Sequence, residues 1–126
     1  MTYKTGDIIL ACFMLRKKLG NKGEQIAAQY YQSLGWQIVV KNFWTRYGEL
    51  DLVLQKNKQI LVVEVKTRRN NNFGWAEESI DEQKILRMQE AYQILKENRC
   101  LPDFYKIAIC IVEIKNNKAK IKTLQI

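Results

Sequence analysis

Four ionisable side chains suited to catalysis lie in one stretch of alternating sequence, residues 48–68: Glu49, Asp51, Glu64 and Lys66. Two apolar runs flank a polar turn at residues 57–58, a pattern typical of a β-hairpin. In that register Asp51 lies directly opposite Glu64, and Glu49 lies opposite Lys66. Because strand side chains alternate between faces, all four project from the same face. Opposed Cβ atoms sit roughly 5 Å apart, so two carboxylates can share one cation.

The absence of histidine narrows the chemistry open to this face. It excludes histidine triads, imidazole bases and histidine-ligated metals. A metal would be held by oxygen ligands, which favours Mg²⁺ or Mn²⁺ over zinc. Asp51, Glu64 and the Val65 carbonyl provide three such ligands. Phosphodiester cleavage needs a divalent cation and an activated water, which Lys66 could orient or deprotonate, while Arg68 holds a neighbouring phosphate.

The alternative is that these residues form a solvated polar end of a sheet with cross-strand ion pairs. Such exposed pairs contribute only about 0–1 kcal/mol each. Chemistry is favoured by the apolar residues Val53, Ile60 and Val62 on the same face, which indicate that part of it is covered. The opposite face is predicted to carry Leu50, Leu52, Leu54, Leu61, Val63 and Val65.

The elements that would position these residues follow from apolar periodicity. A helix is predicted over 22–34, with Glu24 in its first turn, where the helix dipole favours a carboxylate. Strands are expected at 36–43, 104–114 and 119–125, and a connection at 44–47. A second helix over about 82–98 is capped by Asp81 or, less favoured, by Ser79. The order α-β-β-β-α-β-β predicts an α/β fold with a mixed sheet of about five strands flanked by helices.

Residues 1–19 are interpreted as an N-terminal extension, forming a helix turn or a tail, and residues 20–126 as a single domain. The apolar run 8–15 is too short to span a membrane. Its charges follow the run rather than precede it, which argues against a signal peptide. Met14 is an alternative start of translation.

The composition favours a polyanionic partner. The chain of 126 residues carries a net charge of +8, and its pI is about 9.5. This favours nucleic acid over an acidic membrane surface, the alternative being that the charge only maintains solubility. Cys100 and Cys110 are expected to be buried thiols in a reducing compartment, which indicates a cytoplasmic protein.

Asp51 followed by Glu64-Val65-Lys66 resembles the PD-(D/E)xK motif of restriction-endonuclease-like nucleases. More closely, the chain is similar to the YraN-like family of small bacterial proteins, which are related to archaeal Holliday-junction resolvases. The matching segments extend from about residue 20 to 111 and are 20–28, 41–43, 48–53, 63–68, 73–76 and Lys84.

The resemblance implies a restriction-endonuclease-like core with metal ligands at Asp51 and Glu64. It also implies that Lys66 is the catalytic lysine and that Glu24 is a further acid of the site. One position departs: the family usually has an acid where this chain has Lys106. The related resolvases act as dimers on branched DNA, so a homodimer is compatible with the resemblance.

The leading hypothesis is therefore a Mg²⁺- or Mn²⁺-dependent nuclease, or nuclease-like protein, acting on DNA rather than RNA, with branched DNA as a candidate substrate and no membrane partner. The alternative is a non-catalytic nucleic-acid-binding module on the same fold. Arg46, Lys84 and Arg68 are predicted to contact the nucleic acid. The roles of Trp44 and Trp75 are left undecided by the sequence: they could pack in the core, dock to a larger DNA-processing machine or stack on bases.

Overall fold

The computed structural model describes residues 3–9, 19–68 and 81–126. No helix among them is long and apolar enough to cross a membrane. In chain order the elements are β1 (Tyr3–Ile9), α1 (Leu19–Ser33), β2 (Gln37–Thr45), β3 (Gly48–Lys56), β4 (Gln59–Arg68), α2 (Glu82–Arg99), β5 (Lys106–Lys115) and β6 (Lys118–Gln125).

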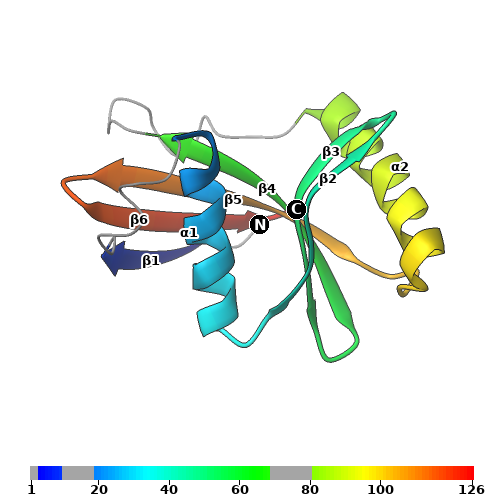
Figure 1. Cartoon of the computed structure of the whole chain (residues 1–126), viewed down its shortest axis with the longest axis horizontal. Helices are drawn as coiled ribbons and strands as arrows, with labels where there is room; N and C mark the ends of the chain where they lie inside the picture. The colour runs from blue at the N-terminus through cyan, green and yellow to red at the C-terminus, as the bar shows by residue number, and fades with distance from the viewer. Residues whose placement is uncertain (1–2, 10–18, 69–80) are drawn as a thin grey trace.

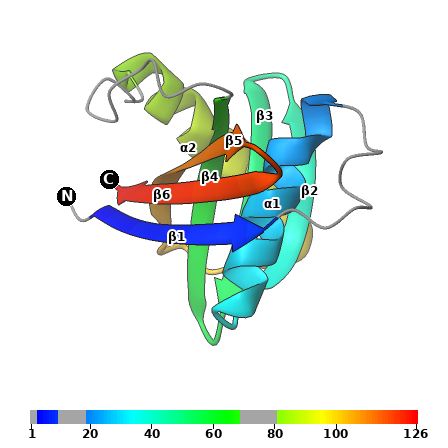
Figure 2. The ribbon, with the colours of Figure 1, turned by 90° about the vertical axis from the view of Figure 1, so that its left-hand side faces the viewer.

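The six strands form one mixed sheet in the order β1-β6-β5-β4-β3-β2. β4 and β5 are parallel, and every other neighbouring pair is antiparallel. A parallel pair needs a crossover connection, and the segment containing α2 makes it. The sheet is strongly twisted, so that β6 runs across the direction of β3 in Figure 1, and α1 and α2 lie on either side of it (Figures 1 and 2). The α/β class and the predicted order from α1 onwards are confirmed.

The sheet has one strand more than expected, because residues 3–9 form β1 rather than a helix turn or a tail. β1 pairs antiparallel with β6, from Tyr3 opposite Leu124 to Ile9 opposite Lys118. This pairing joins the two ends of the chain, so no local pattern within residues 1–19 could have predicted it.

The predicted hairpin register is confirmed for five pairs, from Leu52 opposite Val63 to Lys56 opposite Gln59. Alternation then separates two cores. Fully burying a Leu or Val side chain contributes roughly 1.5–3 kcal/mol, so both cores resist a slip in register. Against α1 lie Leu52, Leu54, Leu61 and Val63, with Ile26, Ala27, Ala28 and Tyr31. Against α2 lie Val53, Ile60 and Val62, with Met88, Ala91, Tyr92 and Leu95.

The position of Leu50 contradicts the predicted assignment of side chains to the two faces of the hairpin. Leu50 was expected beside Leu52, yet it is fully buried in the cluster under α2. The reason is that β3 is no longer paired with β4 at this point, where it remains paired only with β2. Released from β4, the β2–β3 hairpin curves over towards α2 (Figure 1).

The second helix begins and ends with local signals. The Asp81 carboxylate accepts a hydrogen bond from the Lys84 N–H at 2.7 Å, which confirms the predicted cap. Cys100 follows the helix with φ +55°, and its N–H donates to the Lys96 carbonyl. The prediction that Cys100 is buried is wrong, because a residue in this left-handed end position faces solvent. Cys110 is buried in β5, as expected.

Candidate active site

The polar end of the hairpin is a place where two paired strands separate. The ladder between β3 and β4 stops at Leu52 and Val63. The expected pairing of Asp51 with Glu64 is replaced by a side-chain contact, in which Asp51 Oδ2 accepts the Val65 N–H at 2.9 Å. β4 stays paired with β5 as far as Arg68. The carboxylate therefore takes the place of a backbone acceptor and lies in the opening between the strands.

Glu64 lies beside Asp51 in a mostly covered position. Its side chain is 13% exposed, and its buried Oε1 accepts no hydrogen bond. Burial, followed by the negative charge of Asp51, raises the pKa of Glu64 to about 7, while Lys84 and Lys66 oppose this rise. The Lys84 ammonium is 3.6 Å from Oε1, which is an ion pair but too long for a hydrogen bond. The site therefore holds a carboxylate that lacks full compensation.

Two further acids approach from neighbouring elements and meet at one amide. Asn42 of β2 donates from Nδ2 to Glu24 of α1, and also to Glu49 of β3 at 3.3 Å. Burial is the main reason that the pKa of Glu24 is raised, and the Asn42 hydrogen bond counteracts it. Burial and then Asp51 raise the pKa of Glu49. The negative charge of Asp51 thus helps to raise the pKa of Glu24, Glu49 and Glu64.

Asn42 is the site residue that sequence reasoning missed. Its φ of +52° is a left-handed conformation, which Asn tolerates better than most residues. The segment 41–43 was part of the family resemblance, but no role for the amide followed from it. Only the meeting of α1, β2 and β3 shows that this side chain bridges two acids.

The placement of Glu24 depends on how closely α1 approaches β4. α1 begins at Leu19, earlier than predicted, so Glu24 lies beyond the first turn and the helix dipole does not account for it. Gly23 permits the close contact, because a Cβ there would lie 1.8 Å from Thr67 Oγ1. The lack of a side chain at Gly23 thereby allows α1, and with it Glu24, to pack close to the end of β4.

The predicted basic residues divide into two groups. Lys66 and Lys84 act electrostatically on Glu64 from β4 and from the first turn of α2. Arg68 ends β4 and donates to the Thr67 carbonyl at 3.1 Å. Arg46 lies in the turn between β2 and β3, where it donates to the Tyr47 hydroxyl at 2.8 Å and sits 4.9 Å from the ring centroid.

The oxygen ligands predicted for a metal ion, from Asp51, Glu64 and Val65, include one group that favours a hard cation. A buried carboxylate oxygen without a hydrogen bond, Glu64 Oε1, is a group that a cation would compensate. The Val65 N–H points to Asp51, and in an extended strand the carbonyl of the same residue points to the same edge. Within the described part of the chain, no three Asp, Glu, Cys or His side chains converge as a metal cluster. The predicted ligand set does not require such a cluster, because it consists of two carboxylates and one backbone carbonyl.

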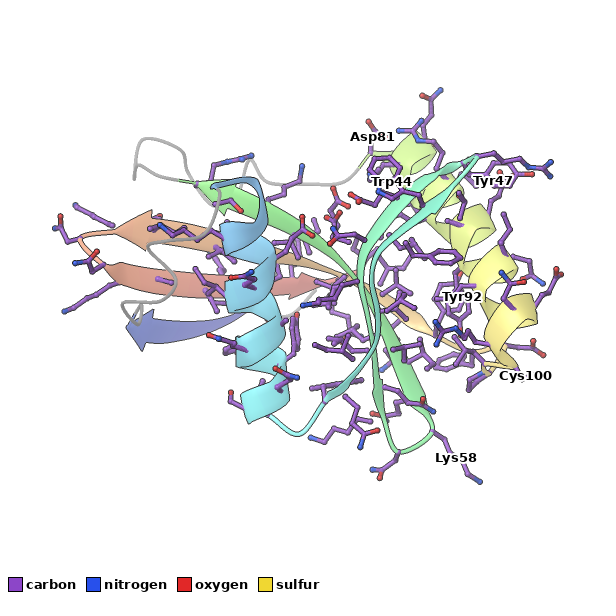
Figure 3. All side chains as sticks on the ribbon, in the orientation of Figure 1. Trp44, Tyr47, Lys58, Asp81, Tyr92 and Cys100 are labelled. Carbon is purple, nitrogen blue, oxygen red and sulfur yellow. The ribbon has the colours of Figure 1, made fainter. Side chains whose placement is uncertain are left out.

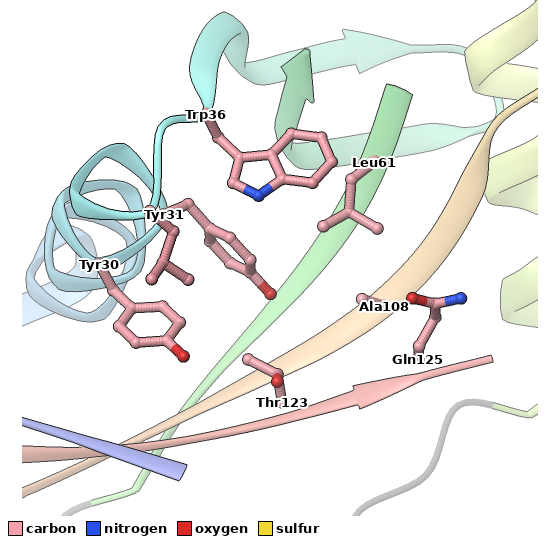
Figure 4. Close-up of a pocket in the computed structure, with 8 residues that line it drawn as sticks. Tyr30, Tyr31, Trp36, Leu61, Ala108, Thr123 and Gln125 are labelled. Atoms are coloured by element: carbon pink, nitrogen blue, oxygen red, sulfur yellow. The ribbon is translucent and has the colours of Figure 1, made fainter. Parts of the chain in front are cut away.

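The position at which the sequence departs from the family pattern lies away from these acids. Lys106 opens β5 opposite Leu61, three pairs from the Glu64 position, so the departure from the family pattern does not touch the acids. Trp75 lies outside the described residues. A cavity of about 130 Å³ at the other end of α1 contains none of the predicted site residues (Figure 4). It is lined by Tyr30, Tyr31, Leu34, Trp36, Leu61, Ala108, Thr123 and Gln125.

Comparison with known proteins gives one consistent result. The profile of the uncharacterised protein family UPF0102 matches residues 23–114. A UPF0102 protein of Syntrophomonas wolfei is 48% identical over 77 residues, which cover 61% of this chain and 67% of that protein. One from Alkaliphilus oremlandii is 33% identical over 109 residues, covering 86% of this chain and 93% of that protein. A UPF0102 protein of Herpetosiphon aurantiacus is 40% identical over 80 residues, which cover 61% of this chain and 64% of that protein.

Proposed function

We propose that this chain, which belongs to the uncharacterised protein family UPF0102, is a Mg²⁺- or Mn²⁺-dependent nuclease with a restriction-endonuclease-like core that acts on DNA. The observation that carries the proposal is the opening between β3 and β4. There Asp51 is held by the Val65 N–H beside the buried Oε1 of Glu64, which accepts no hydrogen bond. Branched DNA is the candidate substrate.

The chemistry matches the demands of phosphodiester hydrolysis. Asp51, Glu64 and the Val65 carbonyl would hold the cation, which when bound would neutralise developing negative charge and favour an ionised water. Lys66 is half-buried on the same strand as Glu64 and acts on its charge. From there the Lys66 ammonium orients the attacking water or stabilises the charge of the phosphate in the transition state; to deprotonate the water, Lys66 would first have to lose its own proton. The Asn42 amide donates hydrogen bonds to both Glu24 and Glu49 and so keeps these two acids in place.

The molecule's charge supports nucleic acid as the partner. The net charge is +8, although several acids gather at the site. The remaining surface is therefore still more basic than the total suggests and attracts a polyanion. Arg46, in the turn between β2 and β3, and Arg68, the last residue of β4, are candidate phosphate contacts.

Cleavage assays test the proposal directly. Purified protein with Mg²⁺ or Mn²⁺ is incubated with duplex, single-stranded, flap and four-way DNA. We expect at least one of these to be cut, and Asp51→Ala to abolish the cutting. The matched control is Asp103→Ala, because Asp103 is exposed and pairs with Lys96 beyond the far end of α2. If wild-type protein cuts none of the substrates with either metal, the enzymatic proposal is wrong.

One observation favours a second candidate, a non-catalytic nucleic-acid-binding module. The Lys84 ammonium is 3.6 Å from Glu64 Oε1, so a cation from the chain itself already offsets part of this charge. Calorimetric titration with Mn²⁺ separates the two candidates. The nuclease predicts binding by wild-type protein that is lost in Asp51→Ala. The binding module predicts no heat in either protein, and DNA affinity that survives Glu64→Ala.

A further inference from the structure

A large exposed aromatic side chain lies next to the acidic residues. Trp44 is 73% exposed and belongs to β2, the edge strand that pairs with β3. It is the cross-strand partner of Glu49. Directly opposed residues of an antiparallel pair project from the same face. Trp44 therefore shares a face with Glu49, whose carboxylate accepts a hydrogen bond from Asn42. Figure 3 shows it near the start of α2, on the curved part of the β2–β3 hairpin.

The position of Trp44 relative to the acids is set by strand geometry. Asn42, which holds Glu24 and Glu49, precedes it by two residues. Two residues of a strand span about 7 Å, so the Trp44 side chain leaves the strand about 7 Å from Asn42, towards the tip of the hairpin. Among the described residues, the other exposed large apolar side chains are Leu34, Leu86, Phe104 and Ile126, and none of them belongs to the β2–β3 hairpin.

The surroundings of Trp44 favour a nucleotide over an apolar protein surface. Just beyond it, at the tip of the hairpin, the Arg46 guanidinium lies 4.9 Å from the centroid of the Tyr47 ring. This pair presents a positive charge and a second ring beside the indole. A flat aromatic face can stack on a base, while the basic tip and the proposed metal site can each hold a phosphate, so together they suit one base and the backbone phosphates next to it.

We propose that Trp44 is a stacking platform for an unpaired nucleobase adjoining the phosphodiester held at Asp51 and Glu64. A base inside a duplex is already stacked on both sides, so only an unpaired base can present its face to the indole. The inference rests on the proposed function for the location of the phosphate. It adds that the preferred substrate has a single-stranded nucleotide at the site, as at a flap, a gap or the centre of a junction.

The test measures binding without cleavage. Wild-type protein and Trp44→Ala are titrated, in buffer containing EDTA, into a fluorescein-labelled thymidine oligonucleotide. A second oligonucleotide has the same length and charge but carries abasic residues in place of thymidines. Stacking on one base predicts that Trp44→Ala binds the thymidine strand about 5- to 100-fold more weakly. Binding of the abasic strand should be unchanged, and Trp44→Tyr should retain most of the affinity.

Phe104→Ala is the matched control. Phe104 is 74% exposed, like Trp44, but lies between the far end of α2 and β5. We expect it to bind both oligonucleotides as wild-type protein does. Tryptophan fluorescence provides a second readout: the thymidine strand should quench it in wild-type protein and much less in Trp44→Ala.

Three results would overturn the inference. One is an equal loss of affinity for both oligonucleotides, and another is a loss as large in Phe104→Ala. The third is a change of oligomeric state in Trp44→Ala by sedimentation velocity, which would mean that a second copy covers the indole. Because EDTA prevents any cleavage, stacking can be confirmed even if the chain proves to be no nuclease. Conversely, active protein that is indifferent to Trp44→Ala would disprove the stacking alone.

Discussion

At the scale of single residues, the site is defined by a carboxylate in an unfavourable place. Glu64 is largely covered, has a buried oxygen without a hydrogen bond and lies beside Asp51. Stability alone does not explain such a group, because an apolar residue would fill the same space at lower cost. A ligand that compensates the charge does explain it, which is why Glu64 carries more weight than the exposed acids.

The raised pKa of Glu64 predicts how stability depends on pH. Between its usual pKa of 4.5 and its folded value of about 7, the folded chain holds a proton that the unfolded chain releases. Stability therefore falls as pH rises through this window and stays lower above it. The penalty at pH 8 is at most about 3.5 kcal/mol, because one pKa unit corresponds to about 1.4 kcal/mol. In Glu64→Gln the fall between pH 4.5 and pH 8 should be smaller, as measured by urea unfolding.

The control is Glu90→Gln, because Glu90 is exposed on α2. Its stability profile should run parallel to that of wild-type protein. Some decline with pH should persist in Glu64→Gln, since the pKa values of Glu24 and Glu49 are also raised. A Glu64→Gln profile parallel to the wild-type one would show that Glu64 ionises normally in the folded chain.

At the scale of elements, the site depends on two departures from regular structure. β3 leaves β4 at Asp51, which opens the space where the acids meet. α1 approaches the end of β4 so closely that Gly23 has no room for a side chain. The first departure brings Asp51 to Val65, and the second brings Glu24 within reach of Asn42.

Gly23→Ala tests the close approach. A methyl group 1.8 Å from Thr67 Oγ1 must push α1 away from β4, and the β-branched Thr67 side chain has little freedom to yield. We expect a loss of about 1–3 kcal/mol in the free energy of unfolding. Any cleavage activity should fall too, because Glu24 moves with the helix.

Thr67→Ala should restore part of the loss in the double variant, since it removes Oγ1 and the Cγ2 atom that lies 3.3 Å from the added methyl. Gln29→Ala is the surface control on the same helix, with an expected change within about 0.5 kcal/mol. If Gly23→Ala is as stable as wild-type protein, the helix is not held by this contact.

At the scale of the whole molecule, the proposed function divides between the basic charge of the chain and the acidic site. The acids gather where the starts of α1 and α2 flank the opened hairpin, whereas the chain as a whole carries a net charge of +8. Affinity for a polyanion arises from many distributed contacts, whereas chemistry needs a few groups at one place. The two can therefore be changed independently.

Salt dependence measures the distributed part. Binding to single-stranded DNA should weaken as salt rises, with a logarithmic slope of about −0.7 for each phosphate neutralised. Arg46→Gln should reduce the magnitude of the slope by about one contact, because Arg46 lies at the tip of the hairpin next to the site. Fluorescence anisotropy at four or more salt concentrations in EDTA measures both slopes.

Lys58→Gln is the matched control. Lys58 is exposed in the turn between β3 and β4, at the end of the hairpin farthest from Trp44 and Tyr47 (Figure 3). Its slope should equal that of wild-type protein. A larger change in Lys58→Gln than in Arg46→Gln would place the nucleic acid at the other end of the sheet.

Short-range patterns in the sequence were enough for the elements and for most of the hairpin. Apolar alternation set the two faces and the register from Leu52 to Lys56, because a slip by one residue would turn both cores outwards. A short polar side chain before an apolar stripe identified Asp81 as the cap of α2. The predicted acids and Lys66 followed from the same alternation together with the family resemblance.

Only the tertiary structure decided how these parts meet. The pairing of β1 with β6 joins residues at the two ends of the chain, and the separation of β3 from β4 exchanges a backbone pair for the contact of Asp51 with Val65. The bridging role of Asn42 and the raised pKa of Glu64 depend on groups from α1, α2, β2, β3 and β4. Periodicity reports which face a side chain occupies. Burial, charge proximity and the end of a ladder are properties of segments packed together, so they arise only when the chain has folded.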